Sequence, residues 1–254
     1  MIGMILGTSE GKKILSLLNK YTNDIFVSTA TSYGGKLLKD YSYKVINTNP
    51  LTLDELIEAL KKNNVQILID ASHPYATVIT ENAVQASLKL GIQYIRYERK
   101  GVASKFEEKI IRVEDYEELG EKLKEVNGSI LNTTGSRNIK KFMDMKLENR
   151  IIHRVLPSTE VMMDCFSLGV KTEDIIAIKG PISYGLNLSF MKEYDAKAIV
   201  LKDSGKEGGT EDKLKAAFDL GVQVFVIKRK KQTFEYVFND EEELVRYIVR
   251  EMME

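Results

Sequence analysis

Residues 67–76 read Ile67-Leu68-Ile69-Asp70-Ala71-Ser72-His73-Pro74-Tyr75-Ala76, and this stretch decides the fold that we predict. It begins as an apolar run of the kind that forms a strand buried on both faces of a sheet. Near its end stands Pro74, whose fixed φ suits the first turn of a helix. A helical pattern of apolar residues follows from Val78 to Leu88. The stretch therefore predicts a buried parallel strand that gives way to a helix.

Polar side chains gather where this strand ends. In open α/β sheets, ligands bind in the crevice beyond the carboxyl ends of the strands, so these side chains are candidates for a site. The alternative is a plain connecting loop, in which Asp70 or Ser72 caps the helix and His73 is exposed to solvent. The candidate residues are Asp70, Ser72, His73 and Tyr75.

The N-terminus offers a second arrangement of strand, glycine loop and helix. Residues 2–6 are apolar, Gly7-Thr8-Ser9-Glu10-Gly11 follows, and residues 14–18 continue with a helical apolar pattern. Phosphate groups bind at such helix starts, so the loop is a candidate nucleotide site. Its spacing, G-x-x-x-G, differs from the dinucleotide fingerprint G-x-G-x-x-G, and a tight turn is the alternative. The candidate cofactor-binding residues are Gly7, Thr8, Ser9 and Gly11.

The next predicted strand, residues 25–30, bears on the choice of cofactor. An enzyme that uses NAD is expected to carry an acidic residue near the end of this strand, where it binds the ribose. Serines and threonines stand there instead, from Ser28 to Ser32, and Lys36 follows. The missing acid favours a 2′-phosphate, but no arginine is present to hold one. The sequence therefore leaves NADPH and NADH open.

Strands and helices alternate along the whole chain, which predicts an α/β fold with doubly wound, mostly parallel sheets. A polar segment at residues 98–107 interrupts the alternation, so we expect an N-terminal domain of residues 1–100 and a C-terminal domain of residues 101–254. A last strand near residues 234–238 could pair with either sheet, and Asn239 fits the cap of a final helix. Other predicted elements are strands 43–46, 92–96, 129–132, 150–156, 175–178, 198–201 and 222–227, and helices near 52–63 and 114–126.

In the second half, polar loops that contain basic residues follow four of the predicted strands. The carboxyl ends of parallel strands share one edge, so backbone N–H groups and basic side chains would converge there on an anionic ligand. For any single lysine or arginine, the alternative is a solvated surface charge. The four loops are Thr133–Arg137, Arg154–Ser158, Lys179–Ser183 and Lys202–Thr210.

Composition limits the class of protein. The chain has 254 residues, with 37 basic and 37 acidic side chains, and this balance argues against a general nucleic-acid binder. The single cysteine, Cys165, excludes an intrachain disulfide and is expected to be buried. No apolar run is long enough to span a membrane, and the N-terminus lacks the basic start of a secretory signal. We therefore expect a cytoplasmic protein without a membrane partner.

The sequence shows no evident protein nucleophile. His73 and His153 lie in different halves, and no nucleophile elbow accompanies them. His153 falls inside an apolar strand and is expected to be a packed structural residue. Two histidines and one cysteine also argue against a transition-metal site, so we assign no metal ligands. The chemistry is therefore expected to come from a cofactor that the protein positions.

An ordered set of motifs, from residue 7 to about Arg229, resembles the precorrin-6A reductase family, which includes the cobalt-precorrin-6A reductases. Each motif alone is unspecific, whereas the ordered set is highly specific. The motifs are Gly7-Thr8-Ser9-Glu10-Gly11, Asp70-Ala71-Ser72-His73-Pro74-Tyr75-Ala76, Arg96-Tyr97-Glu98-Arg99, Thr133-Thr134-Gly135-Ser136, Arg154-Val155-Leu156-Pro157-Ser158, Gly180-Pro181-Ile182-Ser183, and Lys202-Asp203-Ser204-Gly205 with Gly208-Gly209-Thr210.

The resemblance implies two Rossmann-like domains, with the cofactor and a tetrapyrrole in an interdomain cleft. It also implies a reaction of cobalamin biosynthesis, in which hydride from a reduced nicotinamide reduces a carbon–carbon double bond of precorrin-6A and gives precorrin-6B. The chain departs from the family at Ser28–Ser32, which lacks the arginine of members that use NADPH. A lysine-rich composition without tryptophan is compatible with an anaerobe and favours the substrate that contains cobalt.

We therefore predict an NAD(P)H-dependent precorrin-6A reductase, an oxidoreductase acting on a CH–CH bond. His73, beside Asp70 and Tyr75, is expected to position the macrocycle or to relay the proton that accompanies hydride transfer. The pyrophosphate is expected at residues 7–11 or at Thr134, Gly135 and Ser136. The predicted substrate-binding residues are Ser72, Arg137, Arg154, Ser158, Lys179, Ser183, Lys202, Asp203, Ser204, Gly209 and Thr210.

Two other classes of protein stay open at this point. One is a two-domain tetrapyrrole-modifying enzyme without nicotinamide, akin to a uroporphyrinogen synthase, and the other is a small-anion binding protein. The expected ligands are an anionic tetrapyrrole and NADPH or NADH, with no nucleic acid. Transient contact with neighbouring corrin-pathway enzymes would be compatible with this function.

Overall fold

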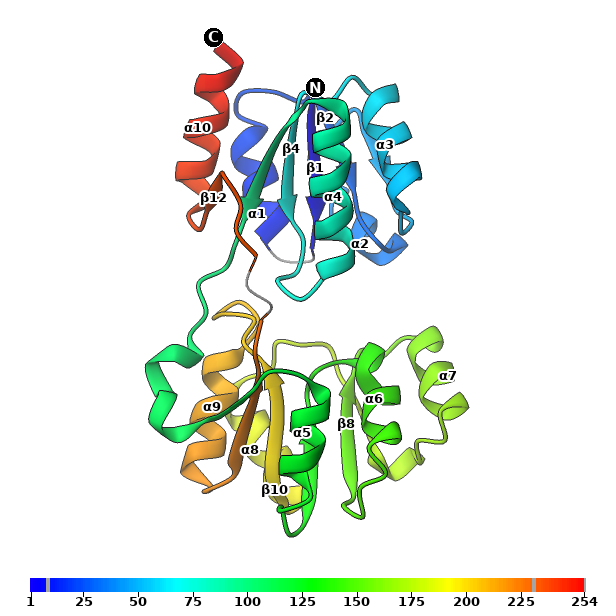
Figure 1. Ribbon diagram of the computed structural model, residues 1–254, viewed down its shortest axis with the longest axis vertical. Helices are drawn as coiled ribbons and strands as arrows, with labels where there is room; N and C mark the ends of the chain where they lie inside the picture. Colours follow the sequence, from blue (N-terminus) through cyan, green and yellow to red (C-terminus); the bar gives the residue numbers. More distant parts are fainter. Residues whose placement is uncertain (8–9, 230–231, 254) are drawn as a thin grey trace. The chain divides into compact units, whose positions relative to one another are not determined.

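The computed structural model describes residues 1–7, 10–229 and 232–253. The chain forms two compact units (Figure 1). The first unit consists of Met1–Arg99 together with Lys231–Glu254, and the second of Lys100–Lys230. In the described part of the chain, each unit holds a six-stranded sheet whose paired strands all run parallel. The predicted α/β class with two Rossmann-like, parallel-sheet domains is confirmed.

The sheet of the first unit is built around the neighbouring strands β1 and β4. Its order is β12-β5-β4-β1-β2-β3, so the chain winds outward in opposite directions from this pair. Such a doubly wound sheet binds ligands at the carboxyl ends of the strands where the direction switches. All residues of β1 are buried, as its apolar run predicts. The strands are β1 (Ile2–Leu6), β2 (Ile25–Ser28), β3 (Val45–Asn47), β4 (Ile67–Ala71), β5 (Gln93–Tyr97) and β12 (Val237–Phe238).

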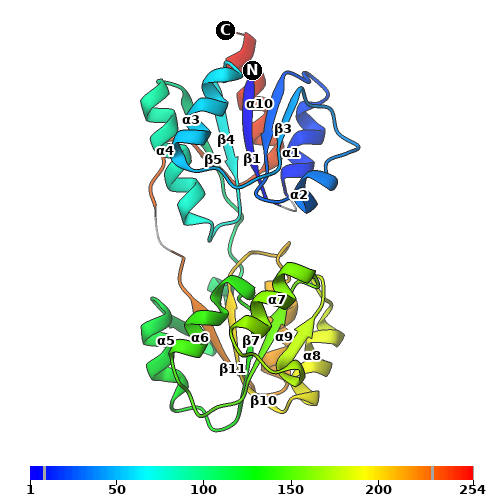
Figure 2. The same cartoon turned by 90° about the vertical axis from the view of Figure 1, so that its right-hand side faces the viewer.

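Helices cover both faces of this sheet (Figures 1 and 2). On one face, α1 and α10 bury Leu15 and Leu244 in the same core, and on the other face α3 and α4 bury Leu56 and Ala83. A capping box of Thr52 and Glu55 opens α3, and Gly91 ends α4 in the left-handed conformation that favours glycine. The helices are α1 (Glu10–Leu18), α2 (Ser32–Lys36), α3 (Leu53–Lys62), α4 (Thr77–Leu90) and α10 (Glu241–Met253).

The second unit repeats this strand order. Its sheet runs β6-β11-β10-β7-β8-β9, so β7 and β10 take the central places that β1 and β4 hold in the first unit. The two strands carry the loops of residues 133–136 and 203–209 at their carboxyl ends. The strands are β6 (Ile111–Val113), β7 (Ser129–Asn132), β8 (Ile151–Val155), β9 (Ile175–Ala177), β10 (Ala196–Lys202) and β11 (Gln223–Ile227).

The second sheet is also covered on both faces. Phe142 of α6 packs with residues of α5 on one face, and Met191 of α8 with Leu214 of α9 on the other. Cys165 of α7 is fully buried, as predicted. None of the helices in the described residues is long and apolar enough to cross a membrane. The helices are α5 (Tyr116–Leu123), α6 (Ile139–Asp144), α7 (Thr159–Ser167), α8 (Tyr184–Glu193) and α9 (Thr210–Asp219), with 3-10 turns at Ala103–Lys109, Ser136–Asn138 and Thr172–Asp174.

One edge strand of each sheet is the first strand after the chain has passed from one unit to the other. After β5 the chain enters the second unit as β6, and after β11 it returns to the first unit as β12. The sequence expectation put all of residues 101–254 in the second domain, whereas β12 and α10 belong to the first unit. Backbone bonds fix this placement, because Arg96 N donates to Tyr236 O at 2.9 Å and Glu98 N to Phe238 O at 2.8 Å.

Two details at these edges differ from the expectation. The short strand β6 falls just after the segment predicted to be a polar break. The final helix begins after Asp240, whose Oδ1 accepts a hydrogen bond from Glu243 N at 2.8 Å, so Asp240 and not Asn239 caps it. Asp and Asn are both good caps, and only the path of the backbone distinguishes them here.

Candidate active site

The loops after β1 and β4 touch each other at the centre of the first sheet. Gly7 N donates to Ala71 O at 3.1 Å, and a Cβ added at Gly7 would lie 3.4 Å from that oxygen and 3.5 Å from His73 N. The structure thus brings two predicted site residues, Gly7 and His73, together at the carboxyl ends of neighbouring strands. Gly11 has a packing role, because a Cβ there would come within 2.9 Å of Leu6. The other two predicted cofactor residues of this loop, Thr8 and Ser9, lie outside the described residues.

Asp70, predicted to line the site, is instead fully buried inside the first unit. Its Oδ2 is 2.8 Å from Arg96 Nη1 and accepts hydrogen bonds from Thr80 Oγ1 at 2.8 Å and from the Tyr94 hydroxyl at 2.9 Å. Its Oδ1 accepts from Ser72 N at 2.9 Å. Burial, with the Asp70 charge beside it, raises the pKa of Tyr94 far above its usual range. The contacts of Asp70 do not include His73, so the expected pairing of carboxylate and imidazole is replaced by an internal ion pair.

The same network holds Ser72 on three sides. Ser72 N donates to Asp70, while Arg96 donates through Nη1 to Ser72 Oγ at 3.1 Å and through Nη2 to Ser72 O at 3.2 Å. Ser72 is itself buried, so it does not present its hydroxyl to a ligand as predicted. Because its carbonyl immediately precedes His73, the buried Arg96 fixes the backbone from which the imidazole projects.

His73 and Tyr75 lie next to this buried network and are accessible to solvent in part. Both are partly exposed, and their rings lie 5.9 Å apart. His73 Nδ1 accepts a hydrogen bond from Tyr75 N at 3.2 Å, so in the neutral imidazole the proton is on Nε2.

The helix after this loop begins later than the sequence indicates. Pro74 lies in a turn closed by a hydrogen bond from Ala76 N to His73 O at 2.8 Å, and α4 starts at Thr77. The residue that caps α4 is Ala76, and no side chain in the described part of the chain caps this helix. The alternative roles of Asp70 and Ser72 as helix caps are therefore also wrong. The turn separates His73 from the helix start and weakens the influence of the helix dipole on it.

In the second unit, the loop after β7 is organised by a buried asparagine. Asn132 Oδ1 accepts from the backbone N of Thr134 at 2.9 Å and from its hydroxyl at 2.7 Å, and Asn132 Nδ2 contacts His153 Nδ1 at 2.9 Å. Burial lowers the pKa of His153 to about 4, so this histidine is neutral and structural, as predicted. Of the predicted cofactor residues here, Gly135 has φ of +91°, a conformation that favours glycine, and Ser136 begins a 3-10 turn.

Basic side chains stand at the carboxyl edge of this sheet in different degrees of burial. Arg154, at the end of β8, donates from Nη1 to Asn187 Oδ1 at 3.0 Å, and burial lowers its pKa to about 10. Lys202 ends β10, and burial, with the charges of Lys141 and Arg137, lowers its pKa to about 8. These shifts show cations in places where a bound anion would stabilise their charge. The exposed members of the predicted set are Arg137 and Lys179.

The remaining predicted substrate residues shape the loops. Asp203 accepts hydrogen bonds from the backbone N of Val102, at 3.1 Å, and of Ala103, at 3.0 Å, so it anchors the segment that enters the second unit. Ser204 N donates to Thr210 Oγ1 at 3.2 Å, and Thr210 is fully buried behind the left-handed Gly209. Two further predicted residues cap helices: Ser158 at the start of α7 and Ser183 at the start of α8.

Sequence reasoning missed four polar residues that organise these edges. Arg96 is a charged position inside an otherwise apolar strand, which is a signal that could have marked it as buried, whereas Lys213 stands among the charged residues Glu211, Asp212 and Lys215 and carries no such signal. Asn132 ends an apolar strand, and Asn187 lies inside a helix; neither position distinguishes a structural amide from a solvated one.

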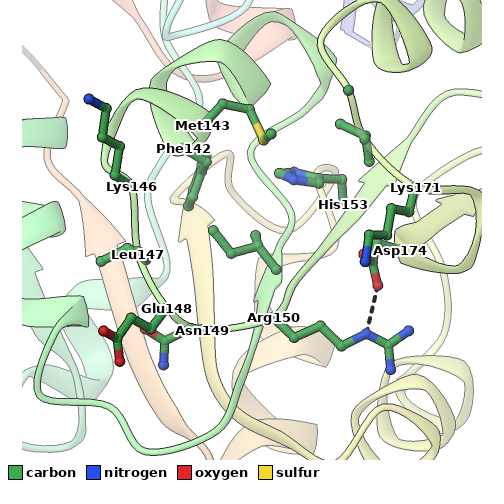
Figure 3. Close-up of a pocket in the computed structure, with 13 residues that line it drawn as sticks. Phe142, Met143, Lys146, Leu147, Glu148, Asn149, Arg150, His153, Lys171 and Asp174 are labelled. Atoms are coloured by element: carbon green, nitrogen blue, oxygen red, sulfur yellow. Dashed lines mark hydrogen bonds and ion pairs between the residues drawn. The ribbon is translucent and has the colours of Figure 1, made fainter.

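The structure also has a cavity of about 350 Å³ in the second unit, beside the start of β8 (Figure 3). Phe142, Met143 and His153 line it, and Arg150 at its rim donates from Nε to Asp174 Oδ1 at 2.6 Å. It contains none of the predicted site residues and lies toward the amino end of the strand, whereas the predicted loops follow the carboxyl ends. We therefore do not assign it to the active site.

The two doubly wound sheets, with glycine-containing loops and basic side chains at their carboxyl edges, define a two-domain Rossmann-type protein suited to anionic ligands. The family model of "Precorrin-6x reductase CbiJ/CobK" matches residues 1–249, and the chain belongs to this family. It is thus an oxidoreductase of cobalamin biosynthesis, and the family predicted from the motifs is confirmed.

Relatives match along nearly the whole chain. A cobalt-precorrin-6A reductase of Methanocaldococcus jannaschii is 35% identical over 245 residues, which cover 94% of this chain and 92% of that protein. A cobalt-precorrin-6A reductase of Priestia megaterium is 32% identical and covers 99% of both chains. The solved structure of "CobK precorrin-6A reductase" superposes with a TM-score of 0.77 at 18% identity, over 98% of this chain and 96% of that one, and supports the fold.

Proposed function

We propose that this protein reduces cobalt-precorrin-6A to cobalt-precorrin-6B with hydride from NADPH. The observation that carries the proposal is the match to cobalt-precorrin-6A reductases, at up to 35% identity, along nearly the full length. A bound reduced nicotinamide would supply the hydride for one carbon of a carbon–carbon double bond, and a proton would add to the conjugated ring system. The protein's own contribution is mainly alignment of the two molecules.

The cobalt-containing substrate is favoured by the pattern of relatives. Six relatives named cobalt-precorrin-6A reductase are 27–35% identical to this chain. Two named precorrin-6A reductase, from Rhodococcus erythropolis and Sinorhizobium, are 28% and 24% identical. The lysine-rich composition without tryptophan points in the same direction.

NADPH is favoured over NADH by the end of β2. Ser28 is buried and accepts a hydrogen bond from Asn47 Nδ2 at 3.1 Å, and Thr29 donates to Thr31 O at 3.1 Å. No carboxylate stands at this strand end to bind a ribose 2′-hydroxyl. Such a place accepts a phosphate more readily than a strand end with an acidic residue.

The pyrophosphate is assigned to the loop of residues 7–11. In the sequence, this loop precedes α1, a helix of 9 residues that begins at Glu10 and whose N-terminal N–H groups attract anions. The rival loop of residues 134–136 leads into a 3-10 turn and then into α6, which has 6 residues. A shorter and interrupted helix is the weaker anion site.

His73 is assigned to the reacting macrocycle. With Nδ1 accepting from Tyr75 N, the neutral ring carries its proton on Nε2. Neutral imidazole suits a residue that positions a carboxylate or carbonyl group by a hydrogen bond, whereas donation of a proton to the ring system would require His73 to be protonated first. Tyr75, with its ring 5.9 Å away, is assigned to the wall of the same site.

The test is a fluorescence titration with NADPH and with NADH, followed by single-turnover reduction of cobalt-precorrin-6A. We expect binding of NADPH at least about tenfold tighter than NADH, and loss of NADPH absorbance only when the substrate is present. A protein that binds neither dinucleotide would instead fit the tetrapyrrole-modifying class without nicotinamide or the anion-binding class, and the proposal would be wrong.

A further inference from the structure

Arg154 and Lys213 of the second unit are cations for which the described part of the chain provides no ion-pair partner. Arg154 Nη1 donates to Asn187 Oδ1 at 3.0 Å, and Lys213 Nζ donates to Gly208 O at 3.1 Å. Among the residues that the structure describes, neither takes part in an ion pair. Lys213 is only 4% exposed, and a charge buried in this way is expensive unless something compensates it.

Local contacts bring these two cations to the same corner of the sheet. The amide of Asn187 that accepts from Arg154 also donates to Ile182 O at 3.1 Å and Ser183 O at 2.9 Å, so it ties Arg154 to the start of α8. The loop before α8 touches the loop before α9, because a Cβ at Gly209 would lie 2.9 Å from Pro181 Cβ. Lys213 is in the first turn of α9 and holds that second loop through Gly208. The corner is therefore formed by two neighbouring helix starts and two cations.

The electrostatics of the corner agree with its geometry. Burial and the charge of Arg154 lower the pKa of Lys213 to about 7, while Asp203 acts in the opposite direction. The oxygens of Asp203 accept hydrogen bonds from the backbone N of Val102, Ala103 and Gly205. The helix starts add partial positive charge of their own. The corner thus has an excess of positive charge that an oxyanion would balance.

We propose that Arg154 and Lys213 together form an oxyanion site at the carboxyl edge of the second sheet, which binds a carboxylate of the tetrapyrrole or a phosphate of the dinucleotide. This inference rests on the proposed function and adds Lys213, which no motif marks, to the binding residues. An oxyanion there supplies the missing counter-charge and keeps Lys213 protonated. Such sites bind ligand at the expense of stability of the empty protein.

The experiment uses Lys213→Met and Arg154→Met in the full chain, with Lys215→Met as the matched control. Lys215 lies on the same helix, is exposed and pairs with Glu211 at 3.0 Å, so its replacement removes the same charge from the surface. Dissociation constants are measured for NADPH, NADH and cobalt-precorrin-6A, and the melting temperature is measured without ligand. We expect both test variants to bind one ligand class at least about tenfold more weakly, Lys213→Met to melt at a higher temperature, and the control to change neither.

The three ligands distinguish the source of the oxyanion. A loss for cobalt-precorrin-6A alone identifies a substrate carboxylate, a loss for both dinucleotides identifies the pyrophosphate, and a loss for NADPH alone identifies the 2′-phosphate. If both folded variants bind all three ligands as the wild type does, or if Lys213→Met lowers the melting temperature and leaves binding intact, the oxyanion site is overturned. That result differs from failure of the proposed function, in which the wild-type protein itself binds no dinucleotide.

Discussion

The central strand pairs of the two units have the same topology and opposite electrostatics. At the β1/β4 pair, the buried Arg96 is neutralised by the buried Asp70 at 2.8 Å. At the edge formed around β7/β10, Arg154 and Lys213 have no ion pair among the described residues, and burial lowers the pKa of each. Strand order thus determines where a site can lie. Charge pairing then determines whether the buried cations at that place are already neutralised or can bind an anion.

A shared turn makes the contrast sharper. Asp70 accepts from the N–H two residues on, Ser72, at 2.9 Å, and Asp203 accepts likewise from Gly205 at 3.3 Å. An aspartate at a strand end thus shapes the loop in both units. In the first unit the same carboxylate also neutralises an arginine, whereas in the second it holds the backbone of Val102 and Ala103. One residue type in one position therefore has two different structural roles.

The largest effect on stability is expected for Asp70→Asn, which removes the buried ion pair of the first unit. It leaves Arg96 buried without a counter-charge, and the loss of a partner in such a pair destabilises by about 3–5 kcal/mol. Urea denaturation measures the change. Asp24→Asn, which removes a carboxylate paired with Lys44 at the surface of the same unit, is the control and should change stability by less than about 1 kcal/mol. Equal effects of the two variants would contradict the closed ion pair.

A fall in pH should lower the stability of the second unit, because His153 is buried in its neutral form. Its folded pKa of about 4 is below the unfolded value, so the unfolded state binds more protons as pH falls from about 6.5 to about 4. Stability is therefore lost through that window, by up to about 1.4 kcal/mol per pH unit and about 3 kcal/mol in all. His153→Gln keeps a hydrogen-bond acceptor for Asn132 and should flatten the slope. Hydrogen exchange resolved by unit measures it, and an unchanged slope in the variant would show that other groups are responsible.

Replacement of His73 tests whether the buried network of Asp70 and Arg96 supports a partly exposed catalytic group. In single turnovers with saturating NADPH, His73→Ala should reduce the substrate about 100-fold more slowly, within the range typical of such groups. His73→Asn should recover most of the rate, because an amide can replace the donor at Nε2. A rate within about twofold of wild type in both variants would return His73 to a plain loop residue. Loss in both would favour proton transfer over positioning.

The smallest effect distinguishes which central strand pair holds the pyrophosphate. Gly7→Val places methyl groups near the carbonyl of Ala71 and should raise the dissociation constant of NADPH about tenfold, or about 1.4 kcal/mol. Gly135→Ala meets no neighbouring atom but strains the backbone at φ of +91°, so it should lower stability while changing the dissociation constant by less than about threefold. Circular dichroism checks that both variants fold. The reverse order would move the cofactor to the second unit, and no effect in either would remove both placements.

Local patterns were sufficient for much of the fold. The apolar runs became central strands, Thr52 and Glu55 form a capping box, and Gly91 ends its helix. These features are encoded within a few residues of each other, by burial of a continuous run and by hydrogen bonds across one helical turn. Local patterns gave a wrong prediction where adjacent residues suit the same role equally well. Asn239 was predicted to cap α10 in place of Asp240, and α4 was predicted to begin within residues 73–76, which form a turn.

The sequence by itself determined the alternation of strands and helices, the parallel class of the sheets and, through its ordered motifs, the family. Only the tertiary structure decided which partner each buried polar group found. Asp70 is 26 positions from Arg96, and β12 pairs with a strand about 140 positions earlier. Such choices depend on the free energy of burying and pairing groups that folding brings together, and no local spacing records them.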